Sequence, residues 1–310
     1  MPLTQCDASV GYRGFITVGG STLPFLSGGF EHIQETIKSQ PLINDTTGAG
    51  RSIYNYTLSK SYYLGKLACE VFSSGGYGQA FRNLLTLAIG SSGKSCNSFT
   101  GSGGNNLVFS PNGGDVFSVP GTGRAVVNGF TIRGNPGGLV QADFSFWSTN
   151  IGSGGASGSV LQFESSPHTE DANPLPYYNS SFLVQGTGDD TLINNYLTDW
   201  SITLSAPVIP IYTLCNPNNA TQNIEANDLR LGFTDITGSF SYFRPAGTVF
   251  GTGLANGCTI SIGLIGSILN LPNVVFVNDT VPNSGPNQAV YRKIQFESFG
   301  LNGQSSISLV

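Results

Sequence analysis

Charge is scarce in this chain. Only 10% of its 310 residues are charged, with 13 Lys and Arg against 18 Asp and Glu, whereas soluble domains carry about 25%. Methionine occurs once, so the long unbranched side chains that favour helices are few. This composition excludes an all-helical fold, a coiled coil and a long charged tail.

Long apolar runs and a secretion signal are missing as well. No stretch approaches the roughly 18 apolar residues that a membrane-spanning helix needs. The opening segment, MPLTQCDASVGYRGF, has neither the basic nor the apolar region of a secretory signal peptide. We therefore expect a protein that is synthesised in a cytoplasm and does not insert into a membrane.

Glycine, apolar and aromatic residues are plentiful instead. The chain has 42 glycines, and 39% hydrophobic and 11% aromatic residues at a net charge of −5 exclude disorder. The negative charge also argues against tight binding of nucleic acid on a basic surface. A surface so poor in charge is typical of a protein that partners cover, because interface cores are depleted of charge. The composition favours an assembly protein.

Strand patterns recur along the whole chain. Alternating and β-branched or aromatic runs, bounded by Gly, Pro, Asn or Ser, predict strands at 14–18, 53–58, 62–72, 106–110, 125–133, 139–148, 160–164, 181–185, 198–204, 210–214, 238–243, 259–264, 273–278 and 290–299. A helix is predicted at Gln79 to Ile89, where Phe81, Leu84, Leu85 and Ala88 form one stripe. Phe30 to Lys38 is a single-turn helix candidate. We expect an all-β fold of sandwich or barrel layers with one or two short flanking helices.

A domain boundary is expected in the loop at about 149–176, which is Gly/Ser-rich, then acidic, then Pro-rich. It divides the chain into an N-terminal β domain at 1–150, which contains the helix near 79–89, and a C-terminal β domain at 151–310. Segments 125–148 and 199–243 both run from strand to strand and end in Phe-Ser-aromatic. That similarity suggests a duplicated β layer.

The best enzyme-like motif is AIGSSGKS, which ends with Lys94 and Ser95 at relaxed phosphate-loop spacing. A phosphate loop needs a strand before it and a helix after it, but here a helix precedes and CNSFTGSGG follows. We expect an ordinary Gly/Ser loop. A Gly-x-Ser-x-Gly nucleophile motif does not occur.

The two histidines and several carboxylates are the remaining candidates for a catalytic or metal site. His32 is expected to be a surface or packing residue, and the neighbours His168, Glu170 and Asp171 are expected to be solvated, although ion binding there stays open. A carboxylate pair for glycoside hydrolysis is defined in space and not in sequence. The candidates for it are Glu164, Asp189, Asp190, Asp199 and Asp235. Asp189 and Asp190 lie in GTGDDT, which predicts a solvated turn. We assign no catalytic, cofactor or metal site and expect a protein that is not an enzyme.

The five cysteines form no Cys-x-x-Cys pair, which argues against a zinc or thioredoxin-type site. They are Cys6, Cys69, Cys96, Cys215 and Cys258. Cys69 is predicted to be a small buried hydrophobe, and disulfide pairing stays open. Asn-x-Ser/Thr sequons at Asn44, Asn55, Asn179, Asn219 and Asn278 are expected by chance in so Asn- and Thr-rich a chain.

Four stretches together resemble the phage tail tube protein family. They are GFITVGGSTLPF (14–25), VVNGFTIRGNPGGLVQADFSFWS (126–148), LTDWSITLSAPVIPIYTL (197–214) and LRLGFTDITGSFSYF (229–243). The last contains a G-x-x-D-[VI]-T-G-S pattern, made by Gly232, Asp235, Ile236, Thr237, Gly238 and Ser239. The helix at 79–89 lies where such proteins pack a helix on the sheet, and together with it the stretches cover about a quarter of the chain.

The resemblance implies a structural virion protein of the phage tail. Its subunits form rings whose sheets join edge to edge into an inner barrel, and the rings stack into a tube through which phage DNA passes. It implies that the subunit pairs with itself and contacts sheath, tape-measure and tail terminator proteins. The lumen is expected to be acidic or neutral, since such a wall repels phosphate.

The length of 310 residues exceeds that of single-domain members of the family. A duplicated tube domain and a single tube domain with an added outer domain both account for it. One tube domain per chain implies a hexameric ring, and two imply a trimer that imitates a hexamer. Both alternatives stay open at this point.

Residues 38–60 are predicted to form two extended arms around a turn at 44–50. The arms either reach a neighbouring subunit or make an ordinary hairpin within one subunit, and the sequence favours neither.

An alternative function is a β-sandwich adhesin or glycan-binding virion module, because sugars stack on aromatic rings and the chain has 12 Tyr, 20 Phe and 2 Trp. Trp147 and Trp200 adjoin alternating strands and are expected in the core. A β-rich hydrolase exported without a signal is a third candidate.

Overall fold

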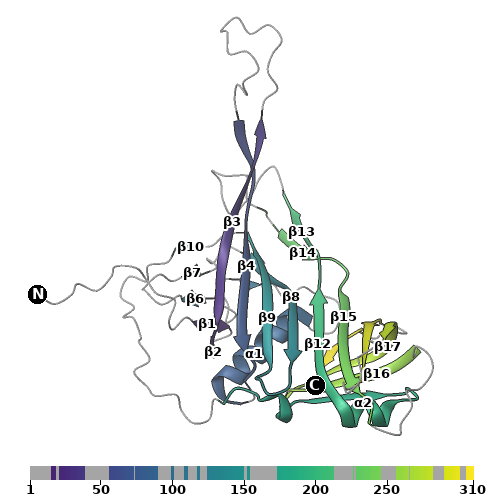
Figure 1. Ribbon diagram of the computed structural model, residues 1–310. Coiled ribbons are helices and arrows are strands. Elements are labelled where there is room, and N and C mark those ends of the chain that lie inside the picture. Colours follow the sequence, from purple (N-terminus) through teal and green to yellow (C-terminus); the bar gives the residue numbers. More distant parts are fainter. Residues whose placement is uncertain are drawn as a thin grey trace, which may run out of the picture.

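The computed structural model describes most of the chain. The described residues are 15–18, 21–38, 56–72, 74–89, 99–100, 108–110, 117–118, 124–149, 152–153, 173–212, 226, 228–245, 256–264, 266–281, 290–300 and 305–310. They form mainly antiparallel β-strands with two short α-helices, which confirms the predicted all-β class (Figure 1). Neither helix is long and apolar enough to span a bilayer.

One large antiparallel sheet dominates the structure. Its twelve strands run in the order β11-β16-β17-β18-β15-β12-β8-β9-β4-β3, with β19 paired to β17 and β5 paired to β8. The strands are β3 (Ser27–Lys38), β4 (Tyr56–Glu70), β5 (Phe99–Thr100), β8 (Arg124–Gly134), β9 (Gln141–Ser148), β11 (Ser181–Gln185), β12 (Leu197–Ser205), β15 (Asp235–Phe243), β16 (Asn256–Gly263), β17 (Ile268–Thr280), β18 (Tyr291–Ser298) and β19 (Ser308–Leu309).

Two small sheets flank the large one. The first has the order β10-β7-β6-β1-β2, and the second is the pair β13-β14. Their strands are β1 (Phe15–Val18), β2 (Ser21–Pro24), β6 (Val108–Ser110), β7 (Phe117–Ser118), β10 (Gly152–Ser153), β13 (Val208–Ile211) and β14 (Asp228–Leu231). Of the predicted strands, 160–164 lies outside the described residues.

Helix α1 (Gly75–Ile89) confirms the predicted helix and begins four residues earlier than expected. Its apolar stripe packs on one face of the large sheet, where the rings of Phe81 and Phe144 meet edge to face at 5.8 Å. A second helix, α2 (Asp190–Tyr196), contacts β11, β12 and β15 and was not predicted. A 3-10 turn, η1 (Tyr177–Asn179), precedes β11.

The prediction of a helical turn at Phe30 to Lys38 was wrong, because these residues belong to strand β3. An isolated turn of helix gains little on its own. In the sheet, by contrast, β3 pairs with β4 along its whole length, from Ser27 opposite Ala68 to Lys38 opposite Tyr56. The strands predicted at 53–58 and 62–72 are correspondingly one long strand, β4, within the described residues.

Both halves of the chain contribute to the large sheet, because β8 pairs with β12. At this junction Trp200 lies opposite Gly134, and a Cβ on Gly134 would lie only 2.6 Å from the indole nitrogen. Glycine is therefore required for the two strands to approach. Of the expected boundary loop at 149–176, residues 150, 151 and 154–172 lie outside the described residues.

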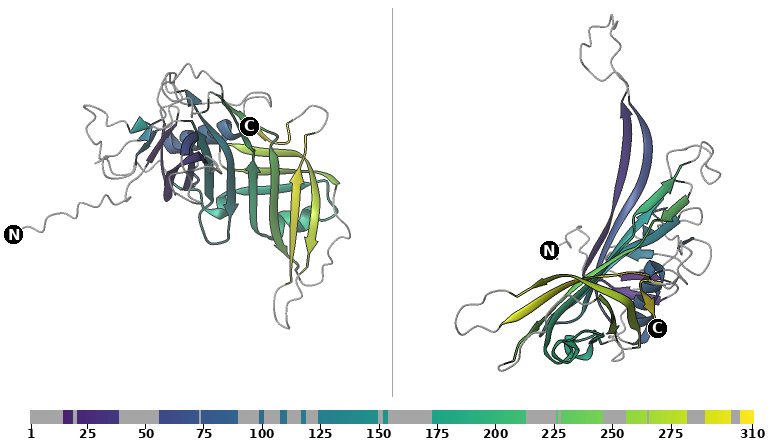
Figure 2. Two further views of the ribbon diagram at one scale, coloured as in Figure 1. Left: turned by 90° about the horizontal axis from the view of Figure 1, so that it is seen from above. Right: turned by 90° about the vertical axis from the view of Figure 1, so that its right-hand side faces the viewer.

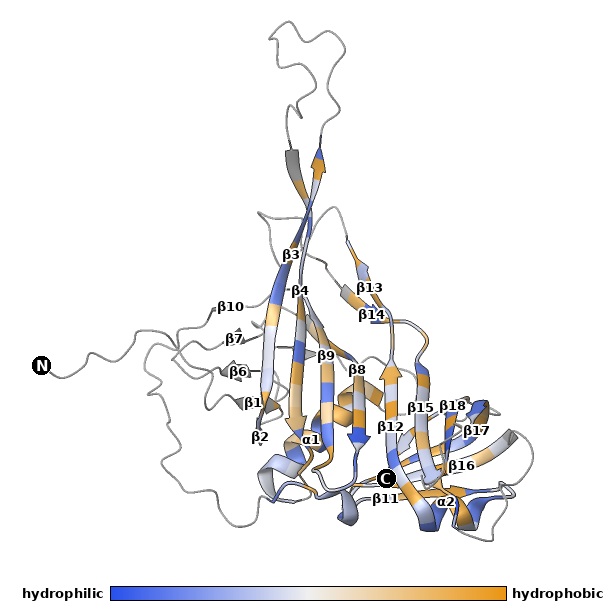
Figure 3. Cartoon of the chain, viewed as in Figure 1, coloured by the Kyte–Doolittle hydropathy of each residue, from blue (hydrophilic) through white to orange (hydrophobic). Residues whose placement is uncertain are grey.

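The core lies on one face of the curved sheet. Figure 2 shows α1 on this side of the first half, while β16 and β11 curl round to cover the second half. Hydrophobic and hydrophilic residues alternate along β9 and β12 (Figure 3), and every second residue of β9 is buried. Phe240 is fully buried among the rings of Phe182, Phe276 and Phe296.

Phe240→Ala should lower the free energy of unfolding by about 3–5 kcal/mol, because it leaves a cavity among three phenyl rings. Phe233, which is 96% exposed, supplies the matched control. Phe233→Ala should change the free energy of unfolding by no more than about 0.5 kcal/mol. Urea unfolding of the dispersed subunit measures both values, and equal losses would contradict the packing described for Phe240.

Candidate functional site: two open sheet edges and a polar face

The enzyme-like candidates do not converge on one site in the part of the chain that the structure describes. Those outside it are Lys94, Ser95, Glu164, His168, Glu170 and Asp171. Helix α1 does precede the Lys94 segment, as expected of a loop that follows a helix. Among the described residues, no three His, Cys, Asp or Glu side chains are grouped so that they could hold a metal ion.

His32 is an exposed residue of β3 and not part of a helical turn. Its Nε2 shares a hydrogen bond with the Ser61 hydroxyl at 2.8 Å, and its ring stacks on Tyr63 at 4.3 Å. These contacts join β3 to β4. His32 is therefore the surface or packing residue that we expected.

The described acidic candidates each have separate partners. Asp190 accepts the backbone N–H groups of Gly186 and Thr187 at 2.8 and 2.7 Å and so fixes the turn before α2. Asp199 accepts hydroxyl hydrogen bonds from Thr198 and Ser241, each at 3.1 Å. Asp235 is exposed at the start of β15.

Asp189 is not the solvated turn residue that we predicted, since its side chain is only 11% exposed. It belongs to a buried cluster around Arg292, which we call the Arg292 cluster and which also contains Tyr242 and Asp279. Arg292 donates to Asp189 at 2.7 Å, to the Tyr242 hydroxyl at 3.1 Å and to Asp279 at 2.8 Å. The Tyr242 hydroxyl donates to Asp189 at 3.0 Å.

Burial and charge shift the pKa values within this cluster. Hydrogen bonding to Asp279 raises the pKa of Arg292 further above its usual range, so the guanidinium stays charged although it is only 4% exposed. Burial raises the pKa of Tyr242, which keeps that hydroxyl protonated. The cluster ties β15, β17 and β18 to the start of α2. Sequence reasoning missed it because Arg292 and Asp189 lie 103 residues apart.

Asp189→Asn should destabilise the subunit by about 1.5–3 kcal/mol, because Arg292 loses a charged hydrogen-bond partner inside the protein. Asp235→Asn is the control, since that carboxylate is exposed and should matter little. Thermal or urea unfolding distinguishes the two variants. An Asp189→Asn variant as stable as the control would show that the buried guanidinium does not depend on the Asp189 charge.

The large sheet has an open edge at β3. Within the described residues β3 pairs only with β4, and nearly all its side chains are exposed. A second open edge lies on β17. Its ladder with β16 stops at Val275, while its ladder with β18 continues to Thr280. In the described structure, residues 276–280 thus have a strand on one side only. Unpaired edges of this kind are templates for pairing with another chain.

The β3–β4 hairpin projects beyond the rest of the sheet (Figures 1 and 2). Strand β9 pairs with β4 only from Tyr63 onward, whereas β3 and β4 stay paired out to Lys38 and Tyr56. A Glu35–Lys60 ion pair at 3.4 Å lies on this projection. Of the predicted arms at 38–60, the described part is therefore a hairpin within the subunit, and 39–55 lie outside the described residues.

Apolar side chains are exposed on the projecting hairpin. Ile37 is 59% exposed and Leu58 is 38% exposed. At the base of the projection, the Lys60 ammonium lies 5.6 Å from the ring centre of Tyr212, next to β13. Burial and the nearby Glu35 raise the pKa of Tyr212 to about 12. Ile37 and Leu58 therefore offer apolar surface on the projecting part of the hairpin.

The sheet face opposite α1 is lined by hydroxyl, amide and charged groups, and we call it the polar face. Its residues include Glu31, Lys66, Glu70, Thr131, Arg133, Gln141, Asp143, Ser145, Asp199, Ser201, Thr203, Asp235, Thr237, Ser239, Lys293, Gln295 and Glu297. Six of them are carboxylates and three are basic. One basic residue, Arg133, is paired with Asp143 at 3.3 Å. The described part of this face is therefore acidic.

The tryptophans do not present rings for a sugar. Trp200 is 2% exposed in the core, as predicted. Trp147, which we expected in the core, is instead half-buried on the polar face, where it packs against the small apolar cluster of Val126, Ala226 and Leu229. The ring of Tyr62 stacks on it at 4.2 Å. The glycan-binding alternative rests on the aromatic content of the chain, and neither tryptophan offers it a fully exposed ring.

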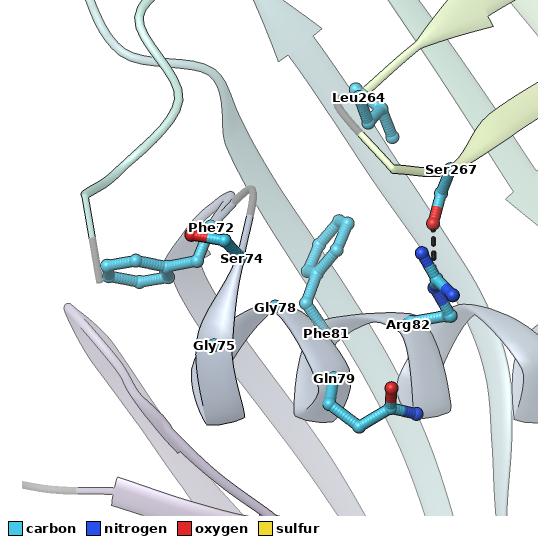
Figure 4. Close-up of a pocket in the computed structure, with 9 residues that line it drawn as sticks. All are labelled: Phe72, Ser74, Gly75, Gly78, Gln79, Phe81, Arg82, Leu264 and Ser267. Carbon is cyan, nitrogen blue, oxygen red and sulfur yellow. Dashed lines mark hydrogen bonds between the residues drawn. The ribbon is translucent and has the colours of Figure 1, made fainter. Parts of the chain in front are cut away.

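A pocket at the start of α1 belongs to the packing of that helix (Figure 4). Arg82 projects from α1 and donates to the Ser267 hydroxyl at 2.8 Å and to the Gly266 carbonyl. These bonds hold the helix against the turn between β16 and β17. The other residues that line the pocket are Phe72, Ser74, Gly75, Gly78, Gln79, Phe81 and Leu264.

The described cysteines are buried. Burial raises the pKa of Cys69, which is the buried hydrophobe that we predicted, and raises the pKa of Cys258 to about 11. Cys6, Cys96 and Cys215 lie outside the described residues. Of the sequons, Asn179 and Asn278 are exposed, while Asn44, Asn55 and Asn219 lie outside that part.

Comparison with known proteins gives one match. A protein-family model described as "Phage tail tube protein" matches residues 47–299, which is most of the chain. The match includes the β17 edge and most of the polar face, and it begins after β3. No curated protein matches the chain.

Proposed function

The chain belongs to the phage tail tube protein family, and we propose that it closes into rings that stack into the DNA-conducting channel of the tail. As a member of this family it is a structural protein of the virion tail that assembles with itself and with other tail proteins. The ring, the channel and the identity of the partners are the proposed part.

The observation that carries the proposal is the pair of open edges on one antiparallel sheet. The β3 edge and the β17 edge lie near opposite ends of the strand order. Joining unlike edges of successive copies gives a head-to-tail contact, which generates a ring when the rotation closes. Closure into a barrel pairs the edge amides that otherwise template aggregation.

The polar face supports a channel wall. In a closed barrel of this sheet, α1 and the core lie on one side and the polar face lies on the other. Its hydroxyl and amide groups keep the channel wall hydrated, and its excess of carboxylates repels the phosphate groups of DNA. DNA then passes without a specific contact that would hold it.

The projecting hairpin supports stacking. It extends past the sheet roughly along the strand direction (Figure 1), so it reaches beyond the rim of its own ring. Exposed Ile37 and Leu58 can then bury apolar surface against the next ring. The tape-measure, sheath and tail terminator proteins are proposed to contact the lumen, the outer surface and the last ring, respectively.

Purified protein should form hollow stacked rings at high concentration in negative-stain microscopy. Sheared tails of the parent virion, added as seeds, supply the end onto which subunits add. Tubes in the unseeded or the seeded sample support the proposal. Compact single subunits in both samples at every concentration would overturn it.

Positive charge on the polar face should make the tube retain DNA. Thr237→Lys combined with Gln295→Lys adds two cations at exposed positions of this face, and the subunit should still fold and assemble. The measurement is binding of short fluorescent duplex DNA to assembled tubes at low and high salt. Thr191→Lys with Ser308→Lys, at exposed positions away from the polar face, is the control. Equal DNA binding by both variants would contradict a lumen made by the polar face.

A further inference from the structure

The two halves of the chain repeat one strand arrangement. In the first half, β3, β4, β8 and β9 occur in this order along the chain, with α1 and β5–β7 between β4 and β8. In the sheet they lie in the order β3-β4-β9-β8. In the second half, β12, β15, β17 and β18 lie in the order β12-β15-β18-β17. Each half is thus a four-strand unit in which the third and fourth strands exchange places.

The fourth strands of the two units match in length and in the alternation of buried residues. Both β9 and β18 have eight residues, and both bury every second residue beginning with the second. This places Phe146 of β9 at the same level as Phe296 of β18. Equal length and equal phase mean that the two strands present the same face to the core.

A β-bulge occurs at the same level in both units. In the first unit the register between β8 and β9 shifts between Val127 and Gly129, next to Phe146. In the second unit the register between β17 and β18 shifts between Phe276 and Asn278, next to Phe296. A bulge adds one residue at a defined position. Because the two bulges occupy the same position, Val127 is equivalent to Phe276, and Thr131 is equivalent to Thr280.

A glycine marks the second strand of both units at this level. Gly65 of β4 lies opposite Phe146, and Gly238 of β15 lies opposite Phe296. A Cβ at either glycine would collide with a phenyl ring. The partner of Gly65 on β3 is Phe30, and the partner of Gly238 on β12 is Ile202. Phe30 and Ile202 are therefore equivalent.

We infer that the chain is a tandem of two tube units and that β17 of one copy pairs with β3 of the next copy in the register in which β8 pairs with β12. The inference rests on the proposed ring assembly and specifies its contact. The repeat matches 125–148 with 274–298, and not with 199–243 as the sequence similarity suggested. A ring of six units then contains three chains.

The register follows from the equivalent residues. Thr203 lies opposite Thr131 and Ser205 lies opposite Gly129 at the junction within the chain. Transferred to the contact between copies, these rungs become Glu31 opposite Thr280 and Ile33 opposite Asn278. His32 lies between them and faces Asp279, so the edges bring an imidazole towards a carboxylate.

The side chains at these rungs suit one another. Thr131 and Thr203 share a hydrogen bond at 3.0 Å within the chain. At the contact between copies, the Thr280 hydroxyl donates to the Glu31 carboxylate, and Lys293 is the next residue across the sheet from Thr280. Glu31, Thr280 and Lys293 are all exposed in the single subunit and free to meet a neighbour.

Disulfide cross-linking tests the register in assembled protein. The background carries Cys6→Ser, Cys96→Ser and Cys215→Ser, while Cys69 and Cys258 stay because they are buried. Glu31→Cys with Thr280→Cys should cross-link copies under mild oxidation, because directly opposite residues lie within disulfide reach. Non-reducing gels should show a ladder that ends at three chains.

Two further pairs serve as controls. Thr131→Cys with Thr203→Cys occupies the equivalent rung within one chain and should form an intramolecular disulfide at a similar rate. Ile33→Cys with Thr280→Cys is shifted by two residues and should cross-link at least tenfold more slowly. Should Glu31→Cys with Thr280→Cys misfold, Ile33→Cys with Asn278→Cys tests the next rung of the same register.

The outcomes separate this inference from the proposed function. Rings or tubes in microscopy together with fast Glu31–Thr280 cross-linking and a three-chain limit support both. If rings form but the shifted pair, Ile33→Cys with Thr280→Cys, cross-links faster, the register is overturned while ring assembly stands. The same holds if rings form and neither pair cross-links. A ladder that ends at six chains overturns the tandem of units. Protein that neither assembles nor cross-links overturns the tube function itself.

Discussion

The requirement that every strand of a sheet be hydrogen-bonded on both sides governs this structure. Within the described residues the chain satisfies it along most of the large sheet, including the junction where β8 meets β12, but β3, the end of β17 and the terminal strand β11 have a strand on one side only. At β11, the side chain of Asn194 from α2 hydrogen-bonds to the backbone N–H and carbonyl of Val184. One face of the sheet is covered by the chain itself through α1, β16 and β11. In the proposed ring, pairing of the β3 edge with the β17 edge of a neighbouring copy would extend the hydrogen-bond pattern that folding begins.

The few charges of the chain have defined places in this scheme. Asp279, near the open end of β17, is bound to buried Arg292, which is anchored in turn by Asp189 at the start of α2. These bonds hold the last residues of β17 in position although a strand supports them on one side only. An edge that is rigid before its partner arrives loses less conformational entropy when pairing occurs. The other described charges lie mainly on the polar face or on the hairpin.

Local sequence patterns predicted the parts of the fold that depend on local interactions. The stripe of Phe81, Leu84 and Leu85 gave α1, and alternation gave β9, β12 and β18. What failed depends on partners distant in sequence. Phe30 to Lys38 is a strand because β4 pairs with it, and Asp189 is buried because Arg292 lies beside it in space. The open edges were beyond prediction for the same reason, since an edge is defined by a missing neighbour in the fold.

The β8–β12 junction has a consequence for how fast and how surely rings close. In the proposed tandem, each chain brings one such junction already made, so a ring would need half as many separate chains to meet as it would with one unit per chain. Fewer bodies lose translational and rotational freedom, and each remaining contact can be individually weak. Weak contacts let a wrongly added subunit dissociate before the ring closes. In the proposed tube, a fused pair of units would thus allow error correction during growth without lowering the stability of the finished tube.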